Sequence, residues 1–166
     1  MAILDFPPVS KADEHGLLAV GGDLEVSSLL LAYSRGIFPW PISVDFPLAW
    51  FSPDPRGILL TDNLHLPRSL KKVMRQERFE VKVNQNFEAV MRSCASATNR
   101  RDGQGTWISE DIIQAYTRLF DAGYAYCVES YNKETQELVG GIYGVQIGHF
   151  LSGESMFYKE SNASKV

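Results

Sequence analysis

Turn-forming residues crowd the first third of the chain and then become rare, which divides the sequence into two parts. Up to position 56 the chain contains Pro7, Pro8, Gly21, Gly22, Gly36, Pro39, Pro41, Pro47, Pro53 and Pro55. Proline removes a backbone donor and glycine favours turns, so this part has little room for long regular elements. One stretch, Val26–Arg35, has the pattern of a short helix, and Gly36 ends it. We expect a small N-terminal domain over residues 1–58.

From residue 59 onward, helical and strand patterns follow one another with shorter turns between them. The helix over 110–122 has the clearest signals, because Ser109 is a good N-cap and Glu110 and Asp111 complement the helix dipole. We expect helices at 67–76, 87–95 and 110–122, and strands at 79–84, 124–131, 138–147 and 149–157. These elements predict an α+β fold for a second domain over residues 59–166.

Composition excludes several classes of protein. The 166 residues are 45% hydrophobic and 22% charged, which is typical of a soluble globular protein. No stretch has the length of a membrane span, and the N-terminus lacks the pattern of a signal peptide. Cys94 and Cys127 are too few for a disulfide framework, so we expect two buried thiols in a cytoplasmic protein. The three histidines are scattered, and no metal-ligand spacing is present.

Two tryptophans lie among glycine, proline and small residues. Trp40 ends the run Gly36-Ile37-Phe38-Pro39-Trp40, and Trp107 lies in Gly105-Thr106-Trp107-Ile108. Such an indole can stack on a nucleobase, a contact worth roughly 1–3 kcal/mol. Burial in the core between loops is the alternative. Trp50, beside Phe51, is predicted to pack in the core.

Six stretches in order along the chain resemble one bacterial family, the leucyl/phenylalanyl-tRNA–protein transferases. They are Gly16–Leu24, Gly36–Trp40, Trp50–Arg56, Gly105–Ile108, Gly153–Phe157 and Asn162–Lys165. The resemblance implies that residues 59–166 form an acetyltransferase-like domain. It also implies that this domain lacks its C-terminal part, because Asn162 resembles the N-cap of a helix that family members continue. We therefore expect the strand over 149–157 to present an open edge, favouring self-association, and little transfer activity.

The reaction implied by the resemblance is an aminoacyl transfer. Leu or Phe would move from charged tRNA to the N-terminal amine of a protein that begins with Arg or Lys, marking that protein for N-end-rule degradation. The aminoacyl ester is already activated, so no cofactor or metal is implied, and catalysis is chiefly positioning.

The resemblance also assigns candidate site residues. Trp40, Trp107, Tyr33 and Tyr116 would hold the aminoacyl-adenosine, and Glu154 would help to position the attacking amine as the catalytic residue. An apolar pocket for the leucyl or phenylalanyl side chain would be lined by Ile142, Leu151 and Met156. Core packing is the alternative for the tyrosines and the pocket residues. An exposed strand position, on the same side as Ser152 and Met156, is the alternative for Glu154.

A basic stretch stands out in an acidic chain of net charge −4. Arg68, Lys71, Lys72 and Arg75 recur at spacings of three and four, which places them on one broad face of the expected helix. The resemblance implies that this face binds the tRNA acceptor arm, where phosphates dominate affinity. A solvated helix face without a partner is the alternative.

One motif points to a different enzyme. Residues 100–105 fit the R-x-x-G-x-G pattern of acetyl-CoA-dependent acetyltransferases. That loop follows a strand and feeds a helix, whereas here it follows a helix that ends near Ala95, so we consider acetyl-CoA the weaker interpretation. A non-enzymatic alternative is a fragment that binds the tRNA acceptor end and transfers nothing.

Overall fold

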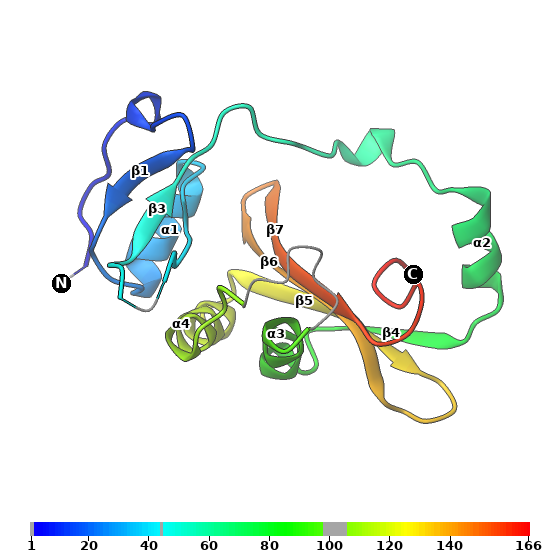
Figure 1. Ribbon diagram of the computed structural model, residues 1–166. Helices are drawn as coiled ribbons and strands as arrows, with labels where there is room; N and C mark the ends of the chain where they lie inside the picture. Colours follow the sequence, from blue (N-terminus) through cyan, green and yellow to red (C-terminus); the bar gives the residue numbers. More distant parts are fainter. Residues whose placement is uncertain (1, 44, 98–105) are drawn as a thin grey trace.

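Two antiparallel sheets organise the chain, and helices pack between and beside them (Figure 1). The computed structural model describes residues 2–43, 45–97 and 106–166. The combination of helices with antiparallel sheets confirms the predicted α+β class.

The N-terminal sheet has three short strands in the order β1-β3-β2. They are β1 (Leu17–Val20), β2 (Phe38–Pro39) and β3 (Ala49–Phe51), and the helix α1 (Val26–Ser34) connects β1 to β2. Trp50 is buried, and its indole Nε1 donates a hydrogen bond of 2.8 Å to the carbonyl of Gly21. The predicted packing role of Trp50 is therefore confirmed.

The second sheet has four strands in the order β4-β5-β6-β7. These strands are β4 (Phe79–Val83), β5 (Ala125–Asn132), β6 (Leu138–Ile147) and β7 (Phe150–Tyr158). Each strand pairs antiparallel with its neighbour, so in the described chain β7 forms one edge of the sheet, as the sequence predicted.

Helices α3 (Phe87–Ala95) and α4 (Glu110–Asp121) cover one face of this sheet (Figure 1). Alternate strand residues point to that face, and Cys127, Tyr143 and Val145 are buried there. The same core includes Leu29 and Tyr33 of α1. The two sheets therefore share one core, although they come from separate parts of the chain.

Among the described residues, cover on the opposite face of the second sheet lies at one end. The helix α2 (Arg68–Arg75) follows the 3₁₀ turn η2 (Thr61–Asn63), and its Val73 packs against a small cluster of Phe79, Val139 and Ala163. The last residues fold back over β6, so closely that a Cβ on Gly140 would lie 2.5 Å from the backbone of Ala163.

Two local expectations have opposite outcomes. Cys94 and Cys127 are free, buried thiols, as predicted. Asn162, in contrast, does not begin a helix: residues 161–165 form a turn, and Asn162 adopts a φ of 70°. The short side chain of Asn tolerates this left-handed conformation, and Asn is common in turns as well as at N-caps.

A buried carboxylate that the sequence did not reveal joins β5 to the start of α3. Glu129 is fully buried, and its Oε1 accepts hydrogen bonds from the backbone amides of Gln85 (2.8 Å) and Asn86 (2.7 Å). The thiol of Cys127 also donates to this oxygen, and Tyr131 donates to the other. Burial and the neighbouring Glu129 raise the pKa of the Cys127 thiol to about 12, so it stays protonated and can donate.

Replacing Glu129 with Ala should destabilise the fold, because it leaves at least two part-buried amides without their acceptor. At about 1–3 kcal/mol for each orphaned group, the free energy of unfolding should fall by on the order of 3 kcal/mol. Urea denaturation measures this loss. Glu80→Ala is the matched control, since Glu80 pairs with Lys82 at the surface and should cost no more than about 1 kcal/mol. Equal losses in the two variants would contradict the structural role of Glu129.

Candidate active site

Glu154 lies at a β-bulge in β7. Ser155 pairs with Tyr143 and Gly153 pairs with Gly144, so Glu154 is one extra residue opposite a regular strand. A bulge changes the direction in which side chains point. The predicted alternation of Ser152, Glu154 and Met156 on one side is therefore wrong: Ser152 is buried beside the helices, whereas Met156, beyond the bulge, is on the open face.

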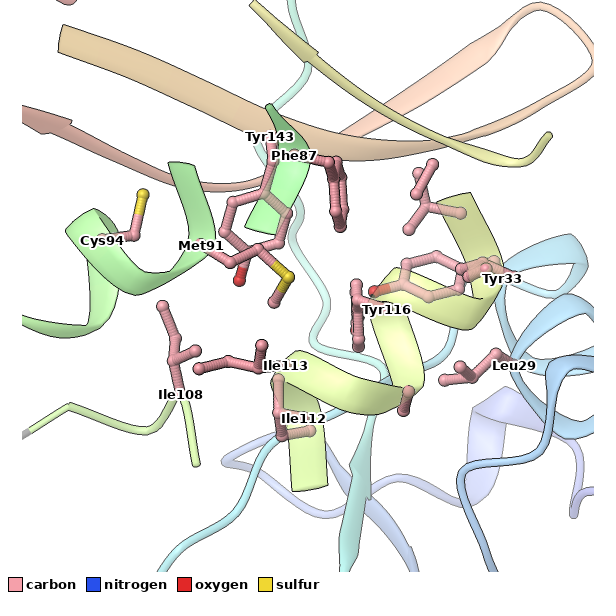
Figure 2. Close-up of a cluster of buried hydrophobic side chains, with 14 of the residues drawn as sticks. Leu29, Tyr33, Phe87, Met91, Cys94, Ile108, Ile112, Ile113, Tyr116 and Tyr143 are labelled. Atoms are coloured by element: carbon pink, nitrogen blue, oxygen red, sulfur yellow. Dashed lines mark hydrogen bonds between the residues drawn. The ribbon is translucent and has the colours of Figure 1, made fainter. Parts of the chain in front are cut away.

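The carboxyl of Glu154 meets two tyrosines contributed by different helices. The hydroxyl groups of Tyr33 in α1 and Tyr116 in α4 are hydrogen-bonded at 2.5 Å, and their rings are at 88° to each other. Both side chains are buried, and Figure 2 shows them in the cluster between α1 and α4. The hydroxyl of Tyr33 also acts on the carboxyl of Glu154 and lowers its pKa. The buried pair Tyr33 and Tyr116 and the partly buried Glu154 thus form a polar chain at the edge of an apolar core.

This environment changes the acidity of Glu154. Burial disfavours its charged form and raises the pKa of the carboxyl to about 7. Hydrogen bonds from Ser152 and Tyr33 and the positive charge of Arg56 act in the opposite direction. Burial also raises the pKa of both tyrosines well above the usual range. At neutral pH the tyrosines are hydrogen-bond donors, and Glu154 exists in both charge states.

Trp40 and Trp107 are brought together by the fold. Their rings stack with centroids 4.9 Å apart and an angle of 20° between their planes. Trp40 is 42% exposed, while Trp107 is partly buried against the core. Because the two indoles already contact each other, a base has access to the open face of Trp40 rather than to a gap between the rings.

A cavity of about 570 Å³ lies beside Trp107. The loop after β2 contributes Ile42 and Phe46 to its wall, and α4 contributes Asp111 and Arg118. The cavity therefore combines apolar and charged groups next to the stacked indoles, as small-molecule sites commonly do.

Ile142, Leu151 and Met156 gather on the open face of the second sheet. Ile142 pairs with Met156 across β6 and β7, and the glycine pair Gly144 and Gly153 follows on the same face. A Cβ on Gly144 would lie 3.3 Å from Leu151, and one on Gly153 would lie 3.9 Å from Ile142. The three predicted pocket residues thus form one apolar patch, in which Leu151 and Met156 are exposed.

The basic residues lie apart from these groups, on α2 (Figure 1). Arg68, Lys71, Lys72 and Arg75 are all exposed, and none of them forms an ion pair with a residue that the structure describes. Leu70 and Val73 instead point toward the protein and are partly buried. The helix therefore presents a one-sided basic surface.

Arg56 is a further charged residue near Glu154, for which the sequence assigned no individual role. Its Nη1 donates a hydrogen bond of 2.7 Å to the carbonyl of Gly36, and its guanidinium lies 4.9 Å from the ring centroid of Phe38. Arg56 is the last residue of the stretch Trp50–Arg56. A single arginine after prolines does not indicate which residue it will contact in the fold.

The remaining expectations concern a loop motif, metal binding and membrane spans, and the described residues test only some of them. The R-x-x-G-x-G motif at 100–105 lies outside them. Within them, no cluster of three or more His, Cys, Asp or Glu side chains is suited to hold a metal ion. No described helix combines the length and the apolar character needed to cross a membrane.

The raised pKa of Glu154 predicts how stability depends on pH. The folded chain holds this proton up to about pH 7, whereas the unfolded chain releases it near pH 4.5. Between these values the folded state binds more protons, so its stability falls as pH rises, by at most about 3 kcal/mol. Glu154→Gln should remove this dependence and gain stability over the wild type as pH rises from 5 to 8. Urea denaturation at several pH values measures the difference.

Glu134→Gln is the control for this prediction, because Glu134 is exposed in the turn between β5 and β6. It should retain the wild-type pH dependence. If the free energy of unfolding of the wild type changed with pH in the same way as that of Glu154→Gln between pH 5 and 8, the raised pKa of Glu154 would be contradicted.

Comparison with known proteins gives matches over both parts of the chain. Residues 58–166 match the family model described as leucyl/phenylalanyl-tRNA protein transferase, and residues 22–54 match the model of its N-terminal domain. Three relatives carry the name leucyl/phenylalanyl-tRNA–protein transferase. The chain is 51% identical to that of Aromatoleum aromaticum, 48% to that of Flavobacterium johnsoniae and 52% to that of Dechloromonas aromatica.

These alignments cover 97–98% of this chain and 67–75% of the relatives. The stacked tryptophans, the glutamate in the bulge and the strand order all lie within the aligned region. The chain belongs to the leucyl/phenylalanyl-tRNA protein transferase family.

Proposed function

We propose that the chain moves Leu or Phe from charged tRNA to the N-terminal amine of proteins that begin with Arg or Lys. One observation carries this proposal: the bulge in β7 directs Glu154 toward Tyr33, while Leu151 and Met156, on either side of the bulge, lie on the open face in the apolar patch. A carboxylate for the amine and an apolar surface for the side chain are the two recognition elements that this reaction needs. Such a protein acts in the cytoplasm and serves N-end-rule degradation.

The terminal adenosine of the tRNA is assigned to the stacked tryptophans. Its base stacks on the open face of Trp40, and Trp107 supports that indole from behind. The cavity beside Trp107 supplies a concave surface next to this stack. Tyr33 and Tyr116 form the buried wall between this region and Glu154.

The leucyl or phenylalanyl side chain is assigned to Ile142, Leu151 and Met156. The absence of a side chain at Gly153, where an added Cβ would lie 3.9 Å from Ile142, leaves space for a ligand atom to approach the backbone. Met156 is flexible and polarisable, so it can adapt to both an aliphatic and an aromatic side chain.

The division of the chain follows the two sheets. We assign residues 1–58 to a small N-terminal domain and residues 59–166 to an acetyltransferase-like domain. The separate sheets and the separate family matches support this division. The consecutive antiparallel strands β4 to β7, with α3 and α4 on one face, support the acetyltransferase-like assignment.

A second candidate function is binding of the tRNA acceptor end without transfer. The specific observation in its favour is that the four cations of α2 lie apart from Glu154 and from the apolar patch. A basic surface of this kind is sufficient for phosphate contacts.

Transfer of labelled Leu from charged tRNA to a peptide that begins with Arg tests the proposed function. Trp40→Ala should lower kcat/KM about 5- to 100-fold, mostly through a higher KM, because a base stack contributes roughly 1–3 kcal/mol. Val20→Ala, a truncation at an exposed position of β1, should leave kcat/KM unchanged. Binding of charged tRNA without transfer would favour the second candidate, and binding of coenzyme A would favour an acetyltransferase.

The salt dependence of tRNA binding tests the basic surface of α2. Replacing Lys71, Lys72 and Arg75 with Ala should weaken binding and reduce the slope of log K against log salt by roughly one for each lost phosphate contact. Filter binding between low and physiological salt measures the slope. Lys11→Ala, in the 3₁₀ turn η1 (Val9–Lys11), is the control and should leave the slope unchanged. An unchanged slope in the triple variant would indicate a solvated face without a partner.

A further inference from the structure

The cavity beside Trp107 contains groups that the terminal adenosine does not use. The base of that adenosine is assigned to the open face of Trp40, and Trp40 is not among the described residues that line the cavity. Trp107 lines it and stacks on Trp40, so one pair of indoles connects the cavity to the proposed base-binding face. The volume of about 570 Å³ lies within the range of small-molecule sites, so a second ligand group can enter.

Helix α4 presents two opposite charges to this cavity. Asp111 lies in the first turn of the helix and Arg118 in the last, and both side chains are exposed. At a rise of about 1.5 Å per residue, the two positions are about 10 Å apart along the helix axis. Neither side chain forms an ion pair with a residue in the described part of the chain. Both charges are therefore available to a ligand.

The loop after β2 adds an apolar and aromatic wall. Ile42 and Phe46 line the cavity and are 51% and 41% exposed. An exposed aromatic ring offers a stacking surface for a nucleobase. Asp23 also lines the cavity, but its Oδ1 already accepts hydrogen bonds from the hydroxyl of Ser28 (2.7 Å) and the amide of Glu25 (3.0 Å). The loop thus supplies a stacking surface, and α4 supplies the charges.

These groups match the parts of one nucleotide. A guanidinium binds phosphate oxygens, and a carboxylate accepts a hydrogen bond from the exocyclic amine of cytosine. Uracil presents an acceptor oxygen at the same position, which a carboxylate does not bind. In an extended nucleotide the phosphate and the base edge lie at opposite ends, as Arg118 and Asp111 do on α4. The basic side chain of an acceptor protein fits this cavity less well, because Arg118 would repel it.

We propose that this cavity holds the nucleotide that precedes the terminal adenosine of the tRNA, a cytidine. Its base stacks on Phe46, its exocyclic amine donates to Asp111, and Arg118 binds its phosphate. The two bases are splayed apart on either side of the indole pair, an arrangement that proteins use to bind single-stranded RNA. The inference rests on the proposed function, to which it adds recognition of a second base.

Binding of short oligonucleotides to the free protein tests the contact of Asp111 with the base. NMR titration of the tryptophan indole signals compares the 5′-phosphorylated dinucleotides pCpA and pUpA with adenosine. The protein should bind pCpA more tightly than adenosine, and about 10-fold more tightly than pUpA, because uracil would place an acceptor against Asp111. Asp111→Asn should remove most of this preference, since an amide can donate to uracil. Asp121→Asn, at the exposed other end of α4, is the matched control and should retain it.

Arg118→Gln tests the phosphate contact in the same titration. It should weaken binding of pCpA and of pUpA by the same factor, about 10-fold, because both lose a charge-assisted contact. Binding of adenosine, which has no phosphate, should stay unchanged. Lys11→Gln removes an exposed cation that does not line the cavity, and it should affect none of the three ligands.

The outcomes separate this inference from the proposed function. Equal affinities of the wild type for pCpA and pUpA would overturn the inference alone, provided that adenosine binds and Leu is transferred. An Arg-initiated dipeptide whose binding is lost in Asp111→Asn and strengthened in Arg118→Gln would assign the cavity to the acceptor protein and overturn the inference. A preference for pCpA that depends on Asp111, in a chain that transfers no Leu, would support the inference and contradict the transferase function alone.

Discussion

The packing of α1 against α4 is the contact on which the rest of the structure depends. The N-terminal sheet is too small to bury its own apolar residues, and Leu29 and Tyr33 of α1 instead enter the core that α4 and the second sheet build. The Tyr33–Tyr116 hydrogen bond satisfies two hydroxyls inside this core, where an unpaired polar group would be costly. Loss of this packing would separate Trp40 from Trp107, which belongs to the other part of the chain.

The bulge in β7 turns one side chain toward that shared core. A regular strand would place Glu154 and Met156 on one face, and a carboxylate would then lie within the apolar patch. One extra residue instead turns Glu154 toward Tyr33 and leaves Met156 beside Ile142. Strand β7 therefore contributes one side chain to a polar site and another to an apolar surface within three residues.

Local sequence patterns predicted most of the elements, because capping and alternation act over a few residues. Ser109 caps α4 as expected, and Gly36 follows α1 with a φ of 73°. The patterns failed where distant residues decide the outcome. The bulge depends on the register between β6 and β7, and the burial of Glu129 depends on amides 43 and 44 positions away. The site residues themselves came from the resemblance to a family, and composition alone would have left Trp40 and Glu154 ambiguous.

The two faces of β7 have a consequence for how such a protein can diverge. Ile142, Leu151 and Met156 lie on the same face as the glycine pair, on the opposite side of the backbone from Glu154 and Tyr33. Substitutions in the patch therefore leave the polar chain and its supporting core unchanged. Natural variation or laboratory selection can alter the bound side chain in small steps, each compatible with folding, while an insertion or deletion beside the bulge would exchange the two faces at once.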